Sequence, residues 1–299
     1  MKARKRLTPE QAERIGIKKI KPNEPGRKTA RYMLDKDQLS RLHNKARILI
    51  FDIETAPLRA YVWGLWKQNI NHDHILTDWF MLTWSAKWLF DDEVMNDKLT
   101  VEEAVNENDK RITKSLFALM NEADIVVAHN GDKFDLRRIN TRFIINGLGR
   151  PSSYHSIDTL KHARKRFSIS SNRLDYLGQF FGLGRKVETG GFKLWDRCMR
   201  GDKSALQEMS LYNDQDVLLL EDVYLHLRPY IQPHPNVGLY INDNVSRCPT
   251  CASDKISEVS EYMTTVNIYP EYKCVDCGSH FRGRKAIKKS DGINSSLPR

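Results

Sequence analysis

Runs of apolar residues mark out a set of buried strands in the middle of the chain. The segment RILIFDIE, which begins at Arg47, is almost continuously apolar, as is typical of a strand at the buried centre of a mixed sheet. Residues 80–89 and 124–129 predict two more strands, and SIDTL near Ile157 predicts another. A folded domain is therefore expected to begin at about residue 46.

Between and after these strands, apolar residues recur three or four positions apart, which predicts amphipathic helices. The helices are expected at residues 109–123, 134–146, 160–166, 174–181 and 203–227. Gly147 directly follows the second of them, and glycine commonly ends a helix. The alternation predicts an α/β fold in which helices flank a mixed central sheet.

The chain is long enough for one enzyme-sized domain and one small module. Of its 299 residues, 40% are hydrophobic and 29% are charged, a globular composition that excludes a largely disordered chain. The longest uncharged run, residues 229–242, spans 14 residues and contains three prolines, well short of the roughly 20 apolar residues that cross a membrane. We expect a basic N-terminal arm at 1–45 with a short helix from Thr8, a domain at 46–230, a linker at 231–246, a cysteine module at 247–285 and a basic tail at 286–299.

Positive charge is concentrated at the two ends of the chain. Residues 1–50 hold 15 Lys and Arg against 5 Asp and Glu, and residues 278–299 hold 6 against 1, within a total net charge of +10. Basic segments that flank a mildly acidic body favour a polyanionic partner, nucleic acid first, over a charge that only maintains solubility. The opening MKARKR lacks the apolar stretch of a secretory signal, so we expect a cytoplasmic location and no membrane partner.

Three short motifs carry acidic residues in candidate catalytic positions. Asp52 and Glu54 in FDIET project from the same face of a strand, while the residue between them points into the core. Asp135 follows AHNGDKF in the first turn of a helix, where a carboxylate is also an ordinary capping residue. Tyr212 and Asp216 lie one turn apart on one face of the 203–227 helix. Each motif alone is more often structural, and their conjunction favours a site.

In this order, the motifs D-x-E, N-x3-F-D and Y-x3-D resemble the signature of the tyrosine-bearing DEDD branch of the DnaQ-like 3′–5′ exonucleases, which have a ribonuclease H-like fold. The second motif is most similar to the proofreading domains of family B DNA polymerases. SNRLDYLGQFFGLG and YNDQDVLLLEDVY are similar to stand-alone phage and bacterial members of the family. The resemblance covers about residues 46–230, and no carboxylate of the signature is missing.

The resemblance implies a two-metal hydrolase. Two Mg²⁺ or Mn²⁺ ions, which suit an oxygen-only ligand set, would be held by four carboxylates: Asp52, Glu54, Asp135 and Asp216. One ion would activate the attacking water, and the other would stabilise the leaving 3′ oxygen. Tyr212 would orient that water, because a phenol with a pKa near 10 is a poor base at neutral pH. Asn130 would hold the motif or the substrate end, with turn capping as the alternative.

The implied activity is removal of nucleoside 5′-monophosphates from the 3′ ends of nucleic acid, with single-stranded DNA as the expected substrate. Alternatives on the same fold are an RNA exonuclease and a structure-specific endonuclease. A non-catalytic nucleic-acid-binding adaptor is the alternative from a different class, and a transposase fits the Y-x3-D helix poorly. Replication or recombination proteins are candidate partners, and a phage-encoded protein of this kind would act in the host cytoplasm.

Four of the five cysteines form a C-x2-C-x22-C-x2-C pattern: Cys248, Cys251, Cys274 and Cys277. This spacing predicts one structural Zn²⁺ in a small C-terminal zinc ribbon, where four thiolates close a tetrahedral site. Disulfides are the alternative, but nothing in the sequence suggests export. The basic run HFRGRKAIKK behind the last pair favours nucleic-acid binding by this ribbon over recruitment of a protein. Cys198 has no partner in the pattern and is expected to be a packing residue.

Aromatic residues cluster between positions 61 and 88. They are Tyr61, Trp63, Trp66, Trp79, Trp84 and Trp88. Exposed rings can serve as stacking platforms for bases, but we expect most of these six to lie in the core.

Overall fold

The structure is a computed structural model that describes residues 18–20, 46–185 and 190–289. The described residues divide into two compact units, which are treated separately below. The first holds residues 18–20 and 47–223, and the second holds residues 46 and 224–289. The helix predicted from Thr8 and most of the basic N-terminal arm and tail lie outside the described residues.

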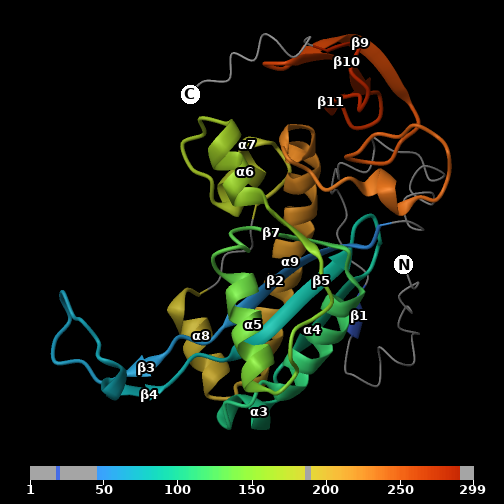
Figure 1. The fold of residues 1–299 in the computed structure, drawn as a ribbon. Helices are drawn as coiled ribbons and strands as arrows, with labels where there is room; N and C mark the ends of the chain where they lie inside the picture. Colours follow the sequence, from blue (N-terminus) through green and yellow to red (C-terminus); the bar gives the residue numbers. More distant parts are fainter. Residues whose placement is uncertain (1–17, 21–45, 186–189, 290–299) are drawn as a thin grey trace. The chain divides into compact units, whose positions relative to one another are not determined.

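A six-stranded mixed sheet forms the centre of the first unit (Figure 1). Its strands run in the order β1-β6-β5-β2-β7-β8. Their bounds are Lys18–Ile20 (β1), Ile48–Thr55 (β2), Met81–Trp88 (β5), Val94–Lys98 (β6), Ile125–Ala128 (β7) and His155–Asp158 (β8). Strand β2 lies in the interior, where it pairs with β5 in antiparallel and with β7 in parallel orientation. Its apolar residues are therefore covered on both faces, as the continuous run predicted.

Helices cover both faces of this sheet. Those of the first unit are α3 (Val101–Val105), α4 (Lys110–Glu122), α5 (Asp135–Ile145), α6 (Thr159–Arg166), α7 (Leu174–Phe180), α8 (Phe192–Met199) and α9 (Lys203–Leu227), of which α9 continues past residue 223. Two successive β5 residues show the two layers, since Trp84 donates from Nε1 to the α4 carbonyl of Ile112 at 2.9 Å, whereas Ser85 donates to Asp214 of α9 at 2.6 Å. The predicted α/β fold is confirmed.

A long hairpin leaves this body between β2 and β5 (Figure 1). It spans residues 56–80, which we call the aromatic hairpin, and contains β3 (Arg59–Ala60), the 3-10 turn η2 (His72–His74) and β4 (Ile75–Thr77). Trp84 is buried, but Tyr61, Trp63 and Trp66 of the hairpin are exposed. The prediction that most of the six aromatic residues lie in the core is therefore wrong, since only Trp84 of the six is buried and the described residues provide no second layer over the hairpin.

The second unit is built on a small antiparallel sheet. Its strands are β9 (Ile256–Met263), β10 (Asn267–Cys274), β11 (His280–Arg282) and β12 (Lys288–Lys289), and β10 pairs with each of the other three. Two 3-10 turns, η3 (Arg228–Tyr230) and η4 (Val237–Tyr240), precede the sheet. The amide of Val237 donates to the carbonyl of Pro249 at 2.8 Å, so part of the expected linker packs on the cysteine module. Among the described residues, no helix is both long and apolar enough to span a bilayer.

Candidate active site

Three of the predicted carboxylates meet at the interior strand β2. Asp52, Glu54 and Asp216 each offer one oxygen, and these oxygens lie within 4.8 Å of one another. Asp52 and Glu54 project from the same face of β2 because Ile53 between them is buried in the core, with 3% of its surface exposed. Asp216 reaches the same point from α9 and is itself buried. Three like charges this close repel one another, so the cluster is suited to a cation.

Asp135, the fourth predicted carboxylate, lies beside this cluster. It is the first residue of α5, and its Oδ1 accepts a 3.4 Å hydrogen bond from the amide of Ile53, the residue between the two β2 acids. Burial, with a smaller contribution from the nearby Asp158 carboxylate, raises the pKa of Asp135 to about 7. Its oxygens are not part of the group within 4.8 Å. The arrangement suits a carboxylate that ionises fully when a cation arrives.

Asn213 is a site residue that sequence reasoning missed. It is fully buried on α9, and its Nδ2 donates a 2.8 Å hydrogen bond to Oδ2 of Asp52. Its position three residues before Asp216 puts it on the same helix face, which is the signal that sequence analysis could have used. Asp214 points elsewhere, as its spacing predicted, and accepts hydrogen bonds from Ser85 and Asn96.

Tyr212 is half-buried on α9, one turn before Asp216. Its ring meets the ring of Trp195 of α8 edge-on, with centroids 6.4 Å apart and planes at 72°. This contact restricts the orientation of the phenol ring. Tyr212 and Asp216 lie on one face of α9, one turn apart, as the Y-x3-D spacing predicted.

The turn after β7 places Asn130 in a structural role. Its backbone has φ 70°, its amide donates to Asp158 Oδ1 at 3.0 Å, and its carbonyl accepts from the amides of Lys133 and Phe134. Asparagine tolerates this left-handed conformation better than most residues. The turn-capping alternative therefore accounts for the backbone of Asn130, and contact with a substrate stays a prediction.

A positively charged side chain, that of Arg138, lies at the end of β2. Arg138 of α5 donates from Nη1 to Thr55 Oγ1 at 2.7 Å, directly after Glu54 in the strand. Its guanidinium also lies 4.4 Å from the ring centroids of Trp79 and Phe134. Burial lowers the pKa of Arg138 from its usual value, although Asp135 opposes that change. The sequence motifs did not single out Arg138, which is a candidate contact for a phosphate group.

The four patterned cysteines gather in the second unit. One sulfur from each lies within 4.8 Å of the others, with Sγ–Sγ distances of 3.6 Å between Cys248 and Cys277 and 3.5 Å between Cys251 and Cys274. Four sulfurs about 2.3 Å from a tetrahedral Zn²⁺ would be about 3.8 Å apart, so the donor set fits this ion. Cys198 is buried in the core of the first unit, as expected.

Arg228 is buried beside this sulfur cluster, with 4% of its surface exposed. Burial disfavours its charged form, but Tyr224 and the thiols of Cys251 and Cys277 outweigh burial and raise the pKa of Arg228. A tetrathiolate zinc site carries a net charge of about −2, since four thiolates surround a divalent ion. Arg228 supplies a buried positive charge that offsets it.

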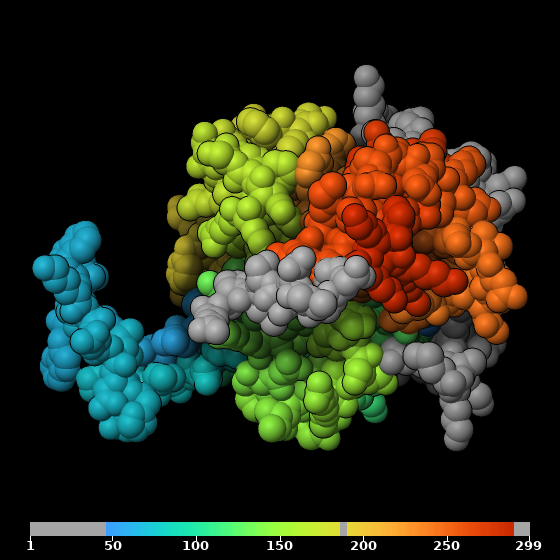
Figure 2. Space-filling model, turned by 45° about the horizontal axis from the view of Figure 1, so that its top comes forward, coloured from blue at the N-terminus to red at the C-terminus, as the bar shows by residue number. Residues whose placement is uncertain are grey.

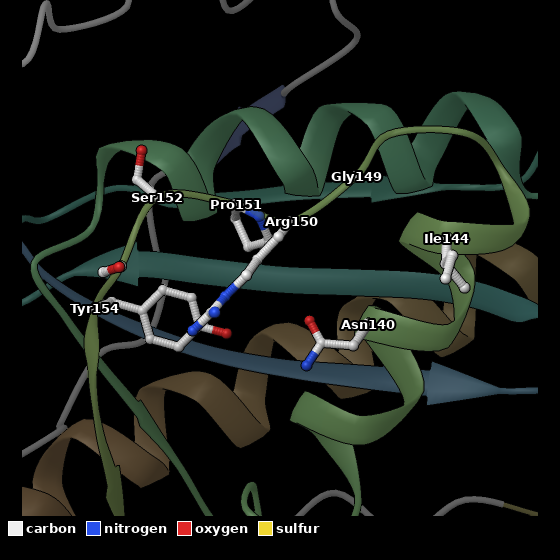
Figure 3. Close-up of a pocket in the computed structure, with 8 residues that line it drawn as sticks. Asn140, Ile144, Gly149, Arg150, Pro151, Ser152 and Tyr154 are labelled. Carbon is white, nitrogen blue, oxygen red and sulfur yellow. The ribbon is translucent and has the colours of Figure 1, made fainter.

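A separate pocket of about 460 Å³ lies between α5 and the segment before β8 (Figure 3). It is lined by Asn140, Ile144, Gly149, Arg150, Pro151, Ser152, Ser153 and Tyr154. Burial raises the pKa of Tyr154, so its phenol stays protonated at neutral pH. None of the clustered carboxylates lines this pocket, so it is not part of the candidate active site.

Comparison with known proteins assigns the family. The family described as the RNase H superfamily matches residues 49–228, which include all the candidate carboxylates. The chain belongs to the RNase H superfamily. Its fold agrees with this assignment, since a central mixed sheet is flanked by helices.

Two polymerases are similar to parts of this RNase H superfamily chain. The DNA polymerase III PolC-type of Ureaplasma parvum serovar 3 is 29% identical over 118 residues, covering 40% of this chain and 8% of the polymerase. The solved family B DNA polymerase from the archaeon Pyrobaculum calidifontis is 18% identical with a TM-score of 0.48, covering 70% of this chain and 27% of that one. The chain thus spans less than a third of the length of either polymerase.

Proposed function

We propose that the protein is a metal-dependent 3′–5′ exonuclease of the tyrosine-bearing DEDD type. The observation that carries this proposal is the meeting of Asp52, Glu54 and Asp216 within 4.8 Å on an RNase H superfamily scaffold, with Asp135 next to them. An adaptor that only binds nucleic acid does not need converging carboxylates, which repel one another without a cation and of which Asp216 is buried.

The proposed roles follow from where each side chain lies. Two Mg²⁺ or Mn²⁺ ions would be held by four carboxylates: Asp52, Glu54, Asp135 and Asp216. Such ions, when bound, supply activation of water and stabilisation of the leaving oxygen. Tyr212, one helix turn from Asp216, would orient the attacking water, and Arg138 would bind the phosphate next to the cleaved bond.

The proposed substrate is single-stranded DNA with a free 3′ end, hydrolysed to nucleoside 5′-monophosphates. DNA is favoured over RNA because the similar PolC-type protein is a DNA polymerase. The positive charge of the first 50 residues and of residues 278–299 suits a polyanion. We place the reaction in the cytoplasm, where replication or recombination proteins are the candidate partners.

We also propose that the second unit is a zinc ribbon with one structural Zn²⁺. The four sulfurs fit that ion, and four protein ligands leave no open coordination position for catalysis. The basic residues after the last cysteine pair include Arg282 of β11, whose guanidinium lies 4.3 Å from the ring centroid of Tyr269. This basic and aromatic surface favours contact with nucleic acid.

The decisive experiment uses oligonucleotides labelled at either end, with Mg²⁺ or Mn²⁺ and with a chelator. Immediate release of mononucleotide from the 3′ label, a gradual ladder from the 5′ label, and no cleavage in chelator are expected. Asp216→Asn should lower the cleavage rate by at least about a thousandfold, since it removes the negative charge of a proposed metal ligand. Glu208→Gln, an exposed acid on the same helix, is the matched control and should cleave normally. Normal cleavage by the Asp216→Asn protein would refute the assignment.

Two alternatives on the same fold are separated by the choice of substrate. Cleavage of circular single-stranded DNA would indicate an endonuclease, since a circle offers no end. Faster digestion of RNA than of DNA of the same sequence would indicate an RNA exonuclease. The proposed function requires the linear DNA to be preferred over both.

A further inference from the structure

The aromatic hairpin exposes large rings that no other described residue of the first unit covers. Trp63, Trp66 and Tyr61 are 94%, 84% and 70% exposed, and Leu65 lies between the two tryptophans. Figures 1 and 2 show the hairpin standing away from the sheet and its helices. A contiguous exposed apolar surface of this kind marks an interaction site.

The base of the hairpin is fixed to the body, so its direction is set by the fold. The amide of Ala56 donates to the carbonyl of Phe80 at 2.8 Å, and Arg59 donates to Thr77 Oγ1 at 2.8 Å. Arg59 also forms an ion pair with Glu107, which lies just after α3. Further along, the amide of Tyr61 donates to the carbonyl of His74 at 2.9 Å. The stem of the hairpin is therefore braced as far as Tyr61, and Trp63 and Trp66 lie in the loop at its tip.

The hairpin starts where the candidate active site ends. Glu54 belongs to the carboxylate cluster, and the hairpin begins two residues later in the same chain. Its other end returns through Trp79, whose ring lies 4.4 Å from the Arg138 guanidinium. A polymer whose end lies at the carboxylate cluster would therefore pass close to the base of the hairpin.

The polar residues of the hairpin suit an anionic polymer. Between residues 61 and 76 the only acid is Asp73, and it contacts Asn71 and His72. The other polar side chains of this stretch can donate hydrogen bonds: Lys67, Gln68, Asn69, Asn71, His72 and His74. A phosphate backbone therefore meets donors and almost no negative charge along this ribbon.

From this we propose that the aromatic hairpin binds the single strand upstream of the cleaved 3′ end, with unpaired bases stacked on Tyr61, Trp63 and Trp66. This inference rests on the proposed exonuclease function and deepens it, because it makes an extended single strand the preferred substrate. Three of the four most exposed apolar side chains of the hairpin are aromatic, and stacking on rings accepts every base. Leu65 offers an apolar edge between neighbouring bases.

A second copy of the chain is the competing occupant of this surface. The hydrogen-bond donors of the hairpin favour nucleic acid over an apolar protein surface. The hairpin also continues directly from the strand that holds Glu54, so a nucleic-acid strand bound at the carboxylate cluster would reach it. Sedimentation of the protein decides the point directly. A dimer that dissociates when the tryptophans are replaced would overturn the proposal.

The test compares two substrates of different length in the full chain. Trp63→Ala with Trp66→Ala should lower kcat/KM on a 30-nucleotide oligo-dT at least about tenfold. Hydrolysis of thymidine 5′-monophosphate p-nitrophenyl ester, which is too short to reach the hairpin, should stay within about twofold. Trp63→Phe with Trp66→Phe should retain most of the activity on the oligonucleotide, because a ring remains. Ile144→Ala replaces an exposed apolar residue of α5 and is the control; it should not change the rate of hydrolysis of either substrate.

Two results would overturn the inference: an equal loss on both substrates, or no loss on the oligonucleotide. Failure of the proposed function has a different signature, because the unaltered protein would then cleave neither substrate. In that case the quenching of tryptophan fluorescence by oligo-dT still tests the hairpin. Quenching that survives the double alanine replacement would refute the stacking role.

Discussion

Hydrogen bonds from individual residues orient the carboxylates of the candidate active site. Asn213 donates to Oδ2 of Asp52 and so fixes the rotamer of a half-exposed acid, while the buried Asp135 lies against the amide of Ile53. The local spacings in D-x-E and Y-x3-D were readable from the sequence, because strand and helix periods determine which faces those residues share. The hydrogen bonds of Asn213 and Arg138 were not readable, since their partners Asp52 and Thr55 are 161 and 83 residues away in the chain, although spacing alone puts Asn213 on the helix face of Asp216.

Replacing Asn213 tests whether it positions Asp52. Asn213→Ala should raise the Mn²⁺ concentration needed for half-maximal hydrolysis by about 10- to 100-fold, because groups that orient metal ligands typically contribute that much. At saturating Mn²⁺ the rate should recover most of its value. Leu211→Ala, an exposed residue on the same helix, is the control and should leave the metal requirement unchanged. A lower rate with an unchanged Mn²⁺ requirement would contradict a positioning role.

The raised pKa of Asp135 predicts how stability depends on pH when divalent ions are removed. An unfolded aspartate titrates near 3.8, whereas burial raises the folded pKa of Asp135 to about 7. The folded state therefore binds more protons between these values, and the free energy of unfolding in chelator should fall as pH rises from about 4 to 7. Asp214, whose pKa burial raises to about 6, adds an effect of the same sign.

Urea unfolding in chelator at several pH values measures this dependence. Asp135→Asn should make the free energy of unfolding less dependent on pH, so that only the dependence due to Asp214 and other acids remains. Mg²⁺ should stabilise the unaltered protein more at pH 8 than at pH 5, because a protonated carboxyl is a poor ligand. A stability that rises with pH in chelator would show that Asp135 is not held in its neutral form.

The predicted helices and strands of the first unit match the structure to within about two residues, but α8 (Phe192–Met199) was missed despite its apolar period, and so was β6, which buried polar groups hold in place. Strand β6 reads VMNDK, and its Asn96 and Asp97 are buried because they bond with Asp214 of α9 and Arg111 of α4. A sequence pattern cannot reveal that such residues are covered, since the partners come from other elements. The aromatic hairpin is the opposite case, where an apolar composition suggested burial that the fold does not provide.

The contact between β5 and α9 depends on a buried ion pair between Lys87 and Glu221. Both side chains are almost fully buried, and Glu221 also accepts a 2.8 Å hydrogen bond from the amide of Phe90. Lys87→Met should lower the free energy of unfolding by about 3–5 kcal/mol, because it leaves a carboxylate buried without its cation. Adding Glu221→Gln should recover much of this loss, since glutamine is neutral and keeps an acceptor for Phe90. Equal losses in the single and double variants, measured by urea unfolding, would contradict this account.

At the scale of the whole molecule, the two units are stabilised by different means. The first has a large apolar core around its central sheet, whereas the buried cluster of the second consists of Cys248, Cys251 and Cys274 with a few neighbours. Strand β9 is exposed along nearly its whole length. A unit with so little buried apolar surface needs another source of stability, and a metal ion supplies it in many small modules.

Removing one zinc ligand should therefore unfold the second unit and spare the first. Cys274→Ser should lower the zinc content from one ion per chain to almost none, because three thiolates do not close the tetrahedral site. Trypsin should then cut within residues 247–289 at least about tenfold faster, since folding of such a module is coupled to metal binding. Cys198→Ser replaces the buried cysteine of the first unit and is the matched control, with zinc content unchanged. Hydrolysis of the mononucleotide ester should persist in the Cys274→Ser protein, because all the clustered carboxylates belong to the first unit. Zinc retained by this variant, or tryptic resistance without zinc, would show that packing alone stabilises the module.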